Sequence, residues 1–362
     1  MRSTFDHARQ AGPTVGVLLC NLGSPDEPTP AAVRRYLAQF LSDPRVVEIP
    51  KVLWWPILHG IILRVRPAKS AAKYASVWMP EGAPLKVITA RQAKQLQGWL
   101  GERGHRVHVR WAMRYGNPSI ASELDALKAA GAQRILVFNA YPQYCGATVA
   151  SVMDEVSAWL QAQRWMPELR VINHYHDHPA YIQALAHSVQ AHWQREGRGK
   201  TLVLSFHGMP ERTLHLGDPY FCECHKTARL LTEALGLRPE EVRVAFQSRF
   251  GRAKWLGPST ESVLQALGAE GPHDVDVLCP GFSADCLETL EEIAMEGADT
   301  LREAGGGALR YIPCLNDSPE GMHALVAVAE QHLQGWPTRE AALSSEALQE
   351  RAARARQHGS SP

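Results

Sequence analysis

Eight short apolar runs, separated by longer stretches with helical periodicity, constrain the fold of this chain more than any other sequence feature. Three of them, Val15–Cys20, Arg134–Asn139 and Thr201–Phe206, are nearly continuous in apolar residues, which is typical of parallel strands covered on both faces. Arg106–Trp111 alternates instead and fits a sheet edge. The remaining predicted strands are Leu169–Asn173, Val242–Gln247, Val275–Cys279 and Leu309–Ile312.

Helical patterns lie between most of these runs. Repeated strand–helix units predict an α/β fold with doubly wound parallel sheets. The predicted helices are Ser119–Ala130, Ala180–Arg195, Thr227–Leu235, Glu261–Leu267, Leu287–Ala304 and Pro319–Leu333.

One short pattern occurs at the end of the first strand of each half. Leu19–Pro25 and Leu204–Pro210 share the order L-x-x-[L/H]-G-x-P and lie 185 residues apart, from position 19 to position 204. With the matching strand counts, this pattern favours two similar α/β domains. We therefore predict an N-terminal domain over residues 14–180 with an inserted segment at 26–83, a C-terminal domain over 198–334, and a polar tail at 338–362 that forms a frayed helix with a disordered end.

Composition narrows the function classes. The 362 residues contain 38 Lys and Arg against 37 Asp and Glu, so the net charge is +1, and binding of nucleic acid through gross charge is not expected. Seven cysteines without regular spacing fit a reducing compartment. The segment Met1–Pro13 lacks the apolar run of a secretory signal. We expect a cytoplasmic protein, with peripheral contact to the inner face of the cytoplasmic membrane as an alternative.

The most apolar stretch is Val52–Leu63, which we call the lip. It is too short to span a bilayer and is interrupted by Pro56, His59 and Gly60, so no single clean amphipathic helix is expected. One interpretation is a buried or half-buried segment of a soluble fold. The other is a flexible apolar wall that touches a greasy ligand or a membrane surface, which the paired Trp54 and Trp55 would suit.

Residues at strand ends are the candidates for chemistry, because ligands of open α/β sheets bind beyond the carboxyl ends of the strands. His207 follows Thr201–Phe206, and Glu288 follows Val275–Cys279 in the same half. One imidazole nitrogen and one carboxylate form a sensible weak site for a divalent first-row metal. The sequence contains no P-loop motif and no glycine-rich dinucleotide motif after a strand.

Four acids near Glu288 have helical spacing. Asp285, Glu288, Glu292 and Glu296 follow one another at steps of three, four and four, which predicts that they stack on one side of a helix. A solvated face is one interpretation. A path for protons or a cation is the other, because repulsion among carboxylates raises their pKa values. Cys222-x-Cys224-His225 lacks the second pair of ligands of a structural zinc site, so no metal is expected there.

Five segments in fixed order, VLLCNLGSPDEP, YPQYCGAT, LSFHGMPER followed by GDPY, FQSRFGRAKWLGPST and CPGFSADCLETLEEI, resemble the ferrochelatase family. Members of this family insert Fe²⁺ into a porphyrin in the last step of protohaem synthesis. The resemblance runs from about Thr14 to Leu333. It implies two similar four-stranded α/β domains, which agrees with the repeated pattern.

The resemblance also implies roles for individual residues. His207, Glu288 and Glu292 would be catalytic, and His207 and Glu288 would bind the metal. Glu292 and Asp285 would belong to an acidic path, and Leu22 would face the macrocycle opposite the histidine. Further contacts with the porphyrin are implied for Arg114, Tyr115 and Trp255, and for Arg64, Arg66 and Lys69 near the propionates. We expect Ile61 and Ile62 of the lip to form part of the same porphyrin pocket.

The implied reaction consumes protoporphyrin IX and Fe²⁺ and releases two protons from a distorted ring. His207 would accept a proton or hand over the metal, and the sequence leaves both roles open. Animal members hold an iron–sulfur cluster on C-terminal cysteines, whereas this chain has no cysteine after Cys314 and Cys145 falls one position from the internal ligand. We therefore expect no resident cofactor. The alternatives are a chelatase for coproporphyrin or a cobalt tetrapyrrole, and a non-catalytic haem or metal carrier.

Overall fold

The computed structural model describes residues 14–251, 253–339 and 344–357. Met1–Pro13, for which no secretory signal is expected, lies outside the described residues, as does the end of the C-terminal tail. None of the helices in these ranges is both long enough and apolar enough to cross a bilayer.

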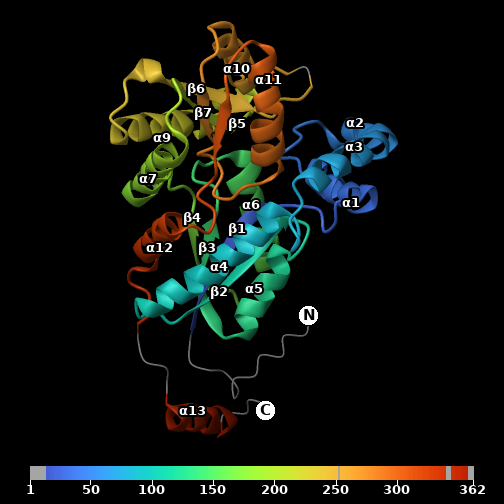
Figure 1. Ribbon diagram of the computed structural model, residues 1–362. Coiled ribbons are helices and arrows are strands. Elements are labelled where there is room, and N and C mark those ends of the chain that lie inside the picture. Colours follow the sequence, from blue (N-terminus) through green and yellow to red (C-terminus); the bar gives the residue numbers. More distant parts are fainter. Residues whose placement is uncertain (1–13, 252, 340–343, 358–362) are drawn as a thin grey trace.

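Two four-stranded parallel sheets form the framework of the described residues (Figure 1). The first has the order β2-β1-β3-β4, and the second has the order β6-β5-β7-β8. All eight predicted strands are present, which confirms the fold class. Their bounds are β1 Thr14–Gly23, β2 Val107–Tyr115, β3 Ala132–Asn139, β4 Glu168–Ile172, β5 Thr201–His207, β6 Val242–Gln247, β7 Val275–Leu278 and β8 Leu309–Ile312.

Strand position explains the two kinds of apolar run. The nearly continuous runs became β1, β3 and β5, which all occupy inner positions. Leu18 and Leu19 of β1 point to opposite faces, and both are fully buried. The alternating run became β2, which lies at the edge of its sheet as predicted.

In each sheet, the strand that comes first in the chain lies between the next two, so the connections run in opposite directions on its two sides. β1 pairs with β2 on one side and β3 on the other, and β5 pairs with β6 and β7 in the same way. Such a reversal separates the loops that leave the two neighbouring strands and opens a crevice at their carboxyl ends. Each half therefore offers one natural binding position, at the ends of β1 and β5.

Helices cover both faces of each sheet (Figure 1). In chain order the helical elements are α1 Pro30–Leu41, α2 Lys51–Ile57, η1 Leu58–Ile62, α3 Leu63–Ser76, α4 Pro84–Glu102, α5 Ile120–Ala129, η2 Gly146–Ala150, α6 Ser151–Gln161, α7 Pro179–Glu196, α8 Glu211–His215, α9 Tyr220–Ala234, η3 Pro239–Glu241, α10 Thr260–Ala269, η4 Glu288–Gly297, α11 Ala298–Glu303, α12 Pro319–Leu333 and α13 Ser345–Gln357.

One hydrophobic core runs through both halves. It joins the α4 face of the first sheet to the α9 face of the second, through α7 and α12. α12 lies within the predicted C-terminal domain, yet it packs against α4 and β3 of the first sheet, while α7 packs against α9 and β8. Because these two helices cross between the halves, the sheets are held together by shared core.

The inserted segment forms a helical unit beside the first sheet, drawn in blue in Figure 1. Its core contains Tyr36, Leu37, Leu58, Leu63 and Tyr74. The lip is helical throughout but does not form one regular helix, as expected, because the π-helix at Leu58–Ile62 separates α2 from α3.

Most of the lip faces outward. Leu58 and Leu63 are buried, whereas Val52 is 85% exposed, Trp55 63% and Ile61 58%. Full burial is therefore excluded, and the lip is half-buried, with its inward residues on the core of the insert and the others exposed. In the tail, α13 confirms the expected helix, and the expected disordered end lies outside the described residues.

Candidate active site

A crevice opens where the carboxyl ends of both sheets meet the helical insert. It encloses about 1170 Å³ of empty space, part of it open to solvent, and its walls are mostly apolar. Four predicted site residues line it, namely Leu22, His207, Trp255 and Glu288. Other lining residues include Tyr36, Phe40, Tyr74, Gln143, Met209, Tyr220, Phe282 and Cys286.

His207 ends β5 with its imidazole fixed in one tautomer. Nδ1 lies 2.8 Å from the carbonyl oxygen of Gly208. Because a carbonyl only accepts, Nδ1 carries the proton and Nε2 keeps a free lone pair. The Tyr220 hydroxyl donates to the His207 carbonyl at 3.0 Å and holds the backbone. The arrangement leaves Nε2 available to a proton or a metal.

Gly208 permits the close turn that follows His207. A Cβ atom at this position would lie 2.5 Å from the carbonyl oxygen of Gln247, whereas the Gly208 N–H donates to that carbonyl at 2.7 Å. A larger residue would separate the ends of β5 and β6. The glycine of the repeated sequence pattern therefore positions the histidine before it.

Glu288 and Glu292 lie on the π-helix η4, beside the end of β6. The Gln247 amide donates to the Glu288 carbonyl at 3.0 Å. The Glu292 carboxylate accepts the Ser248 N–H at 2.6 Å and the Ser248 hydroxyl at 2.5 Å. Burial raises the pKa of Glu292, and repulsion from Glu288 adds to the rise, while Ser248 and His207 act against it. Glu292 therefore holds a proton more readily than an ordinary glutamate does.

The four spaced acids do not form one stack. Lys73 of α3 donates to Glu291 at 2.9 Å and to Glu296 at 2.7 Å, which removes Glu296 from the row. Asp285 is buried on another side, where it accepts hydrogen bonds from Asn316 at 2.6 Å and from Tyr311. The prediction of a single row of four is wrong for Asp285, because it precedes η4 and is held by Asn316 instead.

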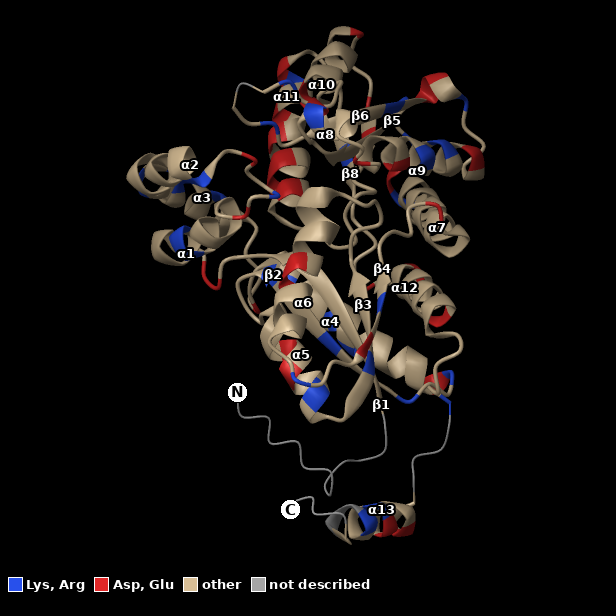
Figure 2. Cartoon of the chain, turned by 180° about the vertical axis from the view of Figure 1, so that it is seen from behind, with Lys and Arg blue, Asp and Glu red and all other residues tan. Residues whose placement is uncertain are grey.

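Two acids remain on the side of Gln247 and Ser248, namely Glu288 and Glu292. Figure 2 shows the acidic residues along the helix that leads into α11. Lys73 reaches this helix from the inserted segment, 218 residues before Glu291 in the chain. The insert therefore neutralises the outer acids, and among the described residues no Lys or Arg forms an ion pair with Glu288 or Glu292.

Known proteins share the sequence of this chain over nearly its whole length. The family profile described as ferrochelatase matches residues 14–333. The chain belongs to the ferrochelatase family. A ferrochelatase of Methylibium petroleiphilum is 63% identical over 353 residues, which cover 98% of this chain and 97% of that protein. A ferrochelatase of Polaromonas sp. is 59% identical over 354 residues, which cover 97% and 96%.

Solved chelatase structures share the fold of this ferrochelatase-family chain. SirB from Bacillus subtilis with Fe³⁺ superposes with a TM-score of 0.52 at 13% identity, covering 88% of this chain and 96% of SirB. The sirohydrochlorin chelatase SirB from Bacillus subtilis subspecies spizizenii in complex with cobalt gives 0.51 at 12% identity, covering 89% and 97%. At these identities the likeness concerns the fold alone.

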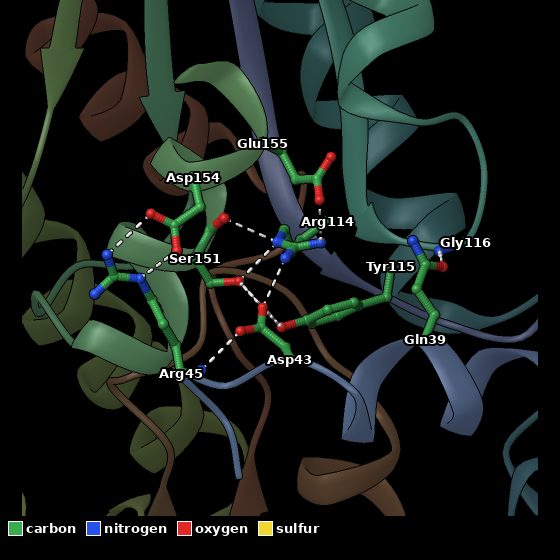
Figure 3. A network of polar contacts seen from close by, with 9 residues as sticks. All are labelled: Gln39, Asp43, Arg45, Arg114, Tyr115, Gly116, Ser151, Asp154 and Glu155. Atoms are coloured by element: carbon green, nitrogen blue, oxygen red, sulfur yellow. Dashed lines mark hydrogen bonds and ion pairs between the residues drawn. The ribbon is translucent and has the colours of Figure 1, made fainter. Parts of the chain in front are cut away.

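Arg114 and Tyr115, predicted to touch the porphyrin, lie in a polar network behind the crevice wall (Figure 3). The Asp43 carboxylate accepts from Arg114 at 2.6 Å, from the Tyr115 hydroxyl at 2.8 Å and from the Ser151 hydroxyl at 2.6 Å. Burial alone would raise the pKa of Asp43, but these donors, together with the Arg45 N–H, hold it below its ordinary value.

The same pair supports the crevice indirectly. The Tyr115 ring packs edge-on against Phe40 with ring centroids 5.1 Å apart, and Phe40 lines the crevice. Neither Arg114 nor Tyr115 is among the lining residues. Their direct contact with porphyrin stays a prediction, and the structure places them where they stiffen the wall.

Four other predicted substrate contacts lie on the lip and at the start of α3. Ile61, Arg64 and Arg66 are exposed and Ile62 is half-buried, and none of the four is among the residues that line the crevice. Ile62 instead packs on the core of the insert. A role as a flexible wall of the porphyrin pocket stays a prediction for these residues.

Several residues of the site could not be identified from the sequence. Ser248 adopts a φ of 61° at the end of β6, which aims both its N–H and its hydroxyl at Glu292. Lys73 pairs with acids more than 200 positions away. Tyr36 and Tyr74 line the crevice from the insert, where the sequence shows only ordinary amphipathic helices. Contacts between residues far apart in the chain leave no pattern in the local sequence.

Proposed function

We propose that the chain inserts Fe²⁺ into protoporphyrin IX in the crevice between its two sheets, forming protohaem and releasing two protons. One observation carries the proposal: an imidazole with a free Nε2 and a carboxyl group, His207 and Glu288, line the same mostly apolar crevice. Family membership supports the same activity, that of a metal-porphyrin chelatase and lyase of haem biosynthesis.

The apolar walls suit the macrocycle. A porphyrin is a large apolar disc whose two carboxylates lie on one edge, so most of its surface gains from burial. Leu22 at the end of β1 and His207 at the end of β5 both line the crevice. Binding energy from these walls can hold the ring in a bent form that exposes a nitrogen lone pair.

Charge must balance during insertion. Fe²⁺ enters with two positive charges, and two N–H protons leave the ring, so the bound product carries no added charge. His207 accepts one proton at Nε2, and its Nδ1–H bond to Gly208 steadies the imidazolium that results. Glu292, whose pKa is raised by burial, takes the second proton. Glu288 and His207 would hold Fe²⁺ only before it enters the ring, so Nε2 is vacated by the metal before it accepts its proton.

An insertion assay tests the proposal. Anaerobic protein with protoporphyrin IX and Fe²⁺ should give many turnovers of haem per chain, followed by visible absorption. Parallel assays with coproporphyrin and with Co²⁺ establish which porphyrin and which metal are preferred. Stoichiometric binding without turnover would identify a carrier and overturn the proposal.

We also propose that the chain holds no resident iron–sulfur cluster. Cys145, which falls one position from an internal cluster ligand of other members, is buried, and the sequence has no cysteine after Cys314 to complete a ligand set. Iron and sulfide analysis of anaerobically purified protein tests this, and stoichiometric sulfide would refute it.

The lip supports a peripheral membrane contact at the cytoplasmic face. Its outward face carries large apolar side chains, and Arg64, Arg66 and Lys69 follow it on α3, also exposed. Apolar residues beside basic ones suit an anionic lipid surface. Co-sedimentation with phosphatidylglycerol vesicles tests this contact, and absence of binding at low salt would count against it.

A further inference from the structure

A second group of metal-ligating side chains lies outside the crevice, where the two halves of the chain meet. His174 and His176 follow β4 of the first half, and Glu223 lies on α9 of the second. One ligand atom from each residue lies within 4.8 Å of the other two. We propose that these three side chains bind a first-row divalent cation that joins the two halves.

The distances between the three ligand atoms are close to those expected around a bound metal ion. His174 Nδ1 lies 2.7 Å from one carboxylate oxygen of Glu223, and His176 Nδ1 lies 3.3 Å from the other. Ligands held about 2.1 Å from a tetrahedral ion are about 3.4 Å apart. A cation would replace the proton shared by His174 and Glu223 and needs only a small adjustment of the side chains.

His176 supplies the second observation. Its side chain is 7% exposed, and within the part of the chain that the structure describes its Nδ1 has no partner in hydrogen-bond geometry. A buried polar atom without a partner costs free energy, so a partner is expected at this nitrogen. The Thr227 hydroxyl of α9 donates to the His176 carbonyl at 2.8 Å and holds the loop with Nδ1 beside Glu223.

The donor set selects the class of cation. Two imidazole nitrogens and one carboxylate suit Zn²⁺, Fe²⁺ or Co²⁺, whereas Ca²⁺ and Mg²⁺ prefer sites made of oxygen ligands. The side chain of His174 is 52% exposed, which leaves a path for the ion and room for a water as fourth ligand. Asp177 is engaged by Lys226 at 2.5 Å, so it is not counted among the ligands.

The site is linked to the crevice through two short connections. The Glu223 oxygen that faces His176 also accepts the Tyr144 N–H at 2.7 Å, and the neighbours of Tyr144, Gln143 and Cys145, line the crevice. Tyr220, one turn before Glu223 on α9, donates to the carbonyl of His207. A bound cation would therefore fix a wall of the crevice without touching either substrate.

The test uses the full chain with His207→Ala, because the proposed function assigns a metal to that histidine. After removal of metal by a chelator, Co²⁺ is titrated and its visible absorption is followed. We expect one equivalent to bind and to be displaced by Zn²⁺. Adding His174→Gln should weaken the Co²⁺ affinity at least about tenfold. Adding His187→Gln, which changes an exposed histidine on α7, should leave it unchanged.

A second measurement guards against loss of structure. Saturating Zn²⁺ should raise the midpoint of thermal unfolding of the His207→Ala chain, because a ligand that binds only the folded state stabilises it. His174→Gln should keep the metal-free midpoint and lose the rise. No stoichiometric binding by His207→Ala, or equal binding after His174→Gln, would overturn the proposal. Failure of iron insertion by the native chain would leave this result untouched.

Discussion

The ends of β1 and β5 occupy equivalent places in the two halves but present different side chains to the crevice. Both ends belong to the repeated pattern, in which Leu22 corresponds to His207, and both residues line the crevice. Each of these strands pairs with neighbours on both sides in the same order. The same backbone arrangement therefore supplies an apolar wall in one half and a proton or metal acceptor in the other.

The residues around the two strand ends also differ, with neutral tyrosines near the end of β1 and carboxylates near the end of β5. In the first half, the insert adds Tyr36 and Tyr74, whose hydroxyl pKa values are raised chiefly by burial, so they stay neutral. In the second half, β6 continues into Gln247 and Ser248, which hold the two glutamates of η4. Apolar lining therefore comes from both halves, whereas the imidazole and the carboxylates that could move protons lie in the second.

Replacing His207 should give the largest effect. His207→Ala removes the free Nε2, and the loss of a positioned acid–base group typically costs about 10²–10⁴-fold in rate. We expect the insertion rate to fall at least about 100-fold while circular dichroism and thermal unfolding remain nearly unchanged, since the side chain lies at the crevice surface. His215→Ala, at an exposed histidine of α8, is the control. Native turnover in His207→Ala would remove this residue from the mechanism.

Glu292 should show its role in the pH dependence. A group that must be ionised to take up a proton makes activity fall as the pH drops through its pKa, and burial raises this pKa. Ser248→Gly removes the hydroxyl that stabilises the ionised form and suits the φ of 61°. We therefore expect the acidic limb of the profile of kcat against pH to move to higher pH.

The matched variant for this prediction is Glu292→Gln, which cannot ionise. It should lower the rate about 100-fold and abolish the acidic limb that Ser248→Gly moves. Steady-state rates between pH 5 and 9 provide the measurement. If the limb keeps its position in both variants, another group controls it, and proton transfer does not pass through Glu292.

The strands were predictable because their signal is local. Val15–Cys20 and Thr201–Phe206 are apolar on both faces, and inner strands of a doubly wound sheet require that pattern. His207 and Glu288 were predictable from their places after strands and from the family resemblance, and the structure brings both to one crevice. Local pattern and topology together located this part of the site.

The rest depended on contacts between distant residues. Asp285, Glu288, Glu292 and Glu296 were expected in one row, but Asp285 precedes η4, and Lys73 pairs with Glu296 and its neighbour Glu291. No local pattern connects positions 73 and 291. On α9 the sequence directed attention to Cys222 and Cys224, of which one is exposed and one buried. Glu223 between them meets His174 only because the two halves pack together.

The two tryptophans of the lip offer a comparison within the first half. Trp54 is half-buried and its indole N–H donates to the Leu41 carbonyl at 2.7 Å, whereas Trp55 is 63% exposed. Trp54→Ala should lower the free energy of unfolding by about 2–3 kcal/mol, somewhat less than the cost for a fully buried aromatic residue. Trp55→Ala should change it by less than about 0.5 kcal/mol.

The two tryptophan variants should rank in the opposite order for vesicle binding, with the larger loss in Trp55→Ala. Trp55→Ala should weaken binding to phosphatidylglycerol vesicles several-fold, because an exposed indole favours the interface. Denaturant unfolding and co-sedimentation provide the two measurements. Equal stability losses in both variants, with unchanged vesicle binding, would show that the lip is ordinary packing and would remove the proposed membrane contact.

Leu22→Ala should give the smallest effect and bears most directly on the comparison between the halves. Leu22 is half-buried and packs on the cores of the insert and of its junction with η4. Losing part of its apolar contact with porphyrin should cost about 1 kcal/mol, or roughly a fivefold rise in KM. If Leu22 only binds the ring, kcat stays unchanged, whereas a role in bending the ring lowers kcat as well. Leu216→Ala, at a 69% exposed leucine of the second half, is the control. An unchanged KM and kcat in Leu22→Ala would mean that the end of β1 does not contact the substrate, and the division of roles between the two strand ends would fail.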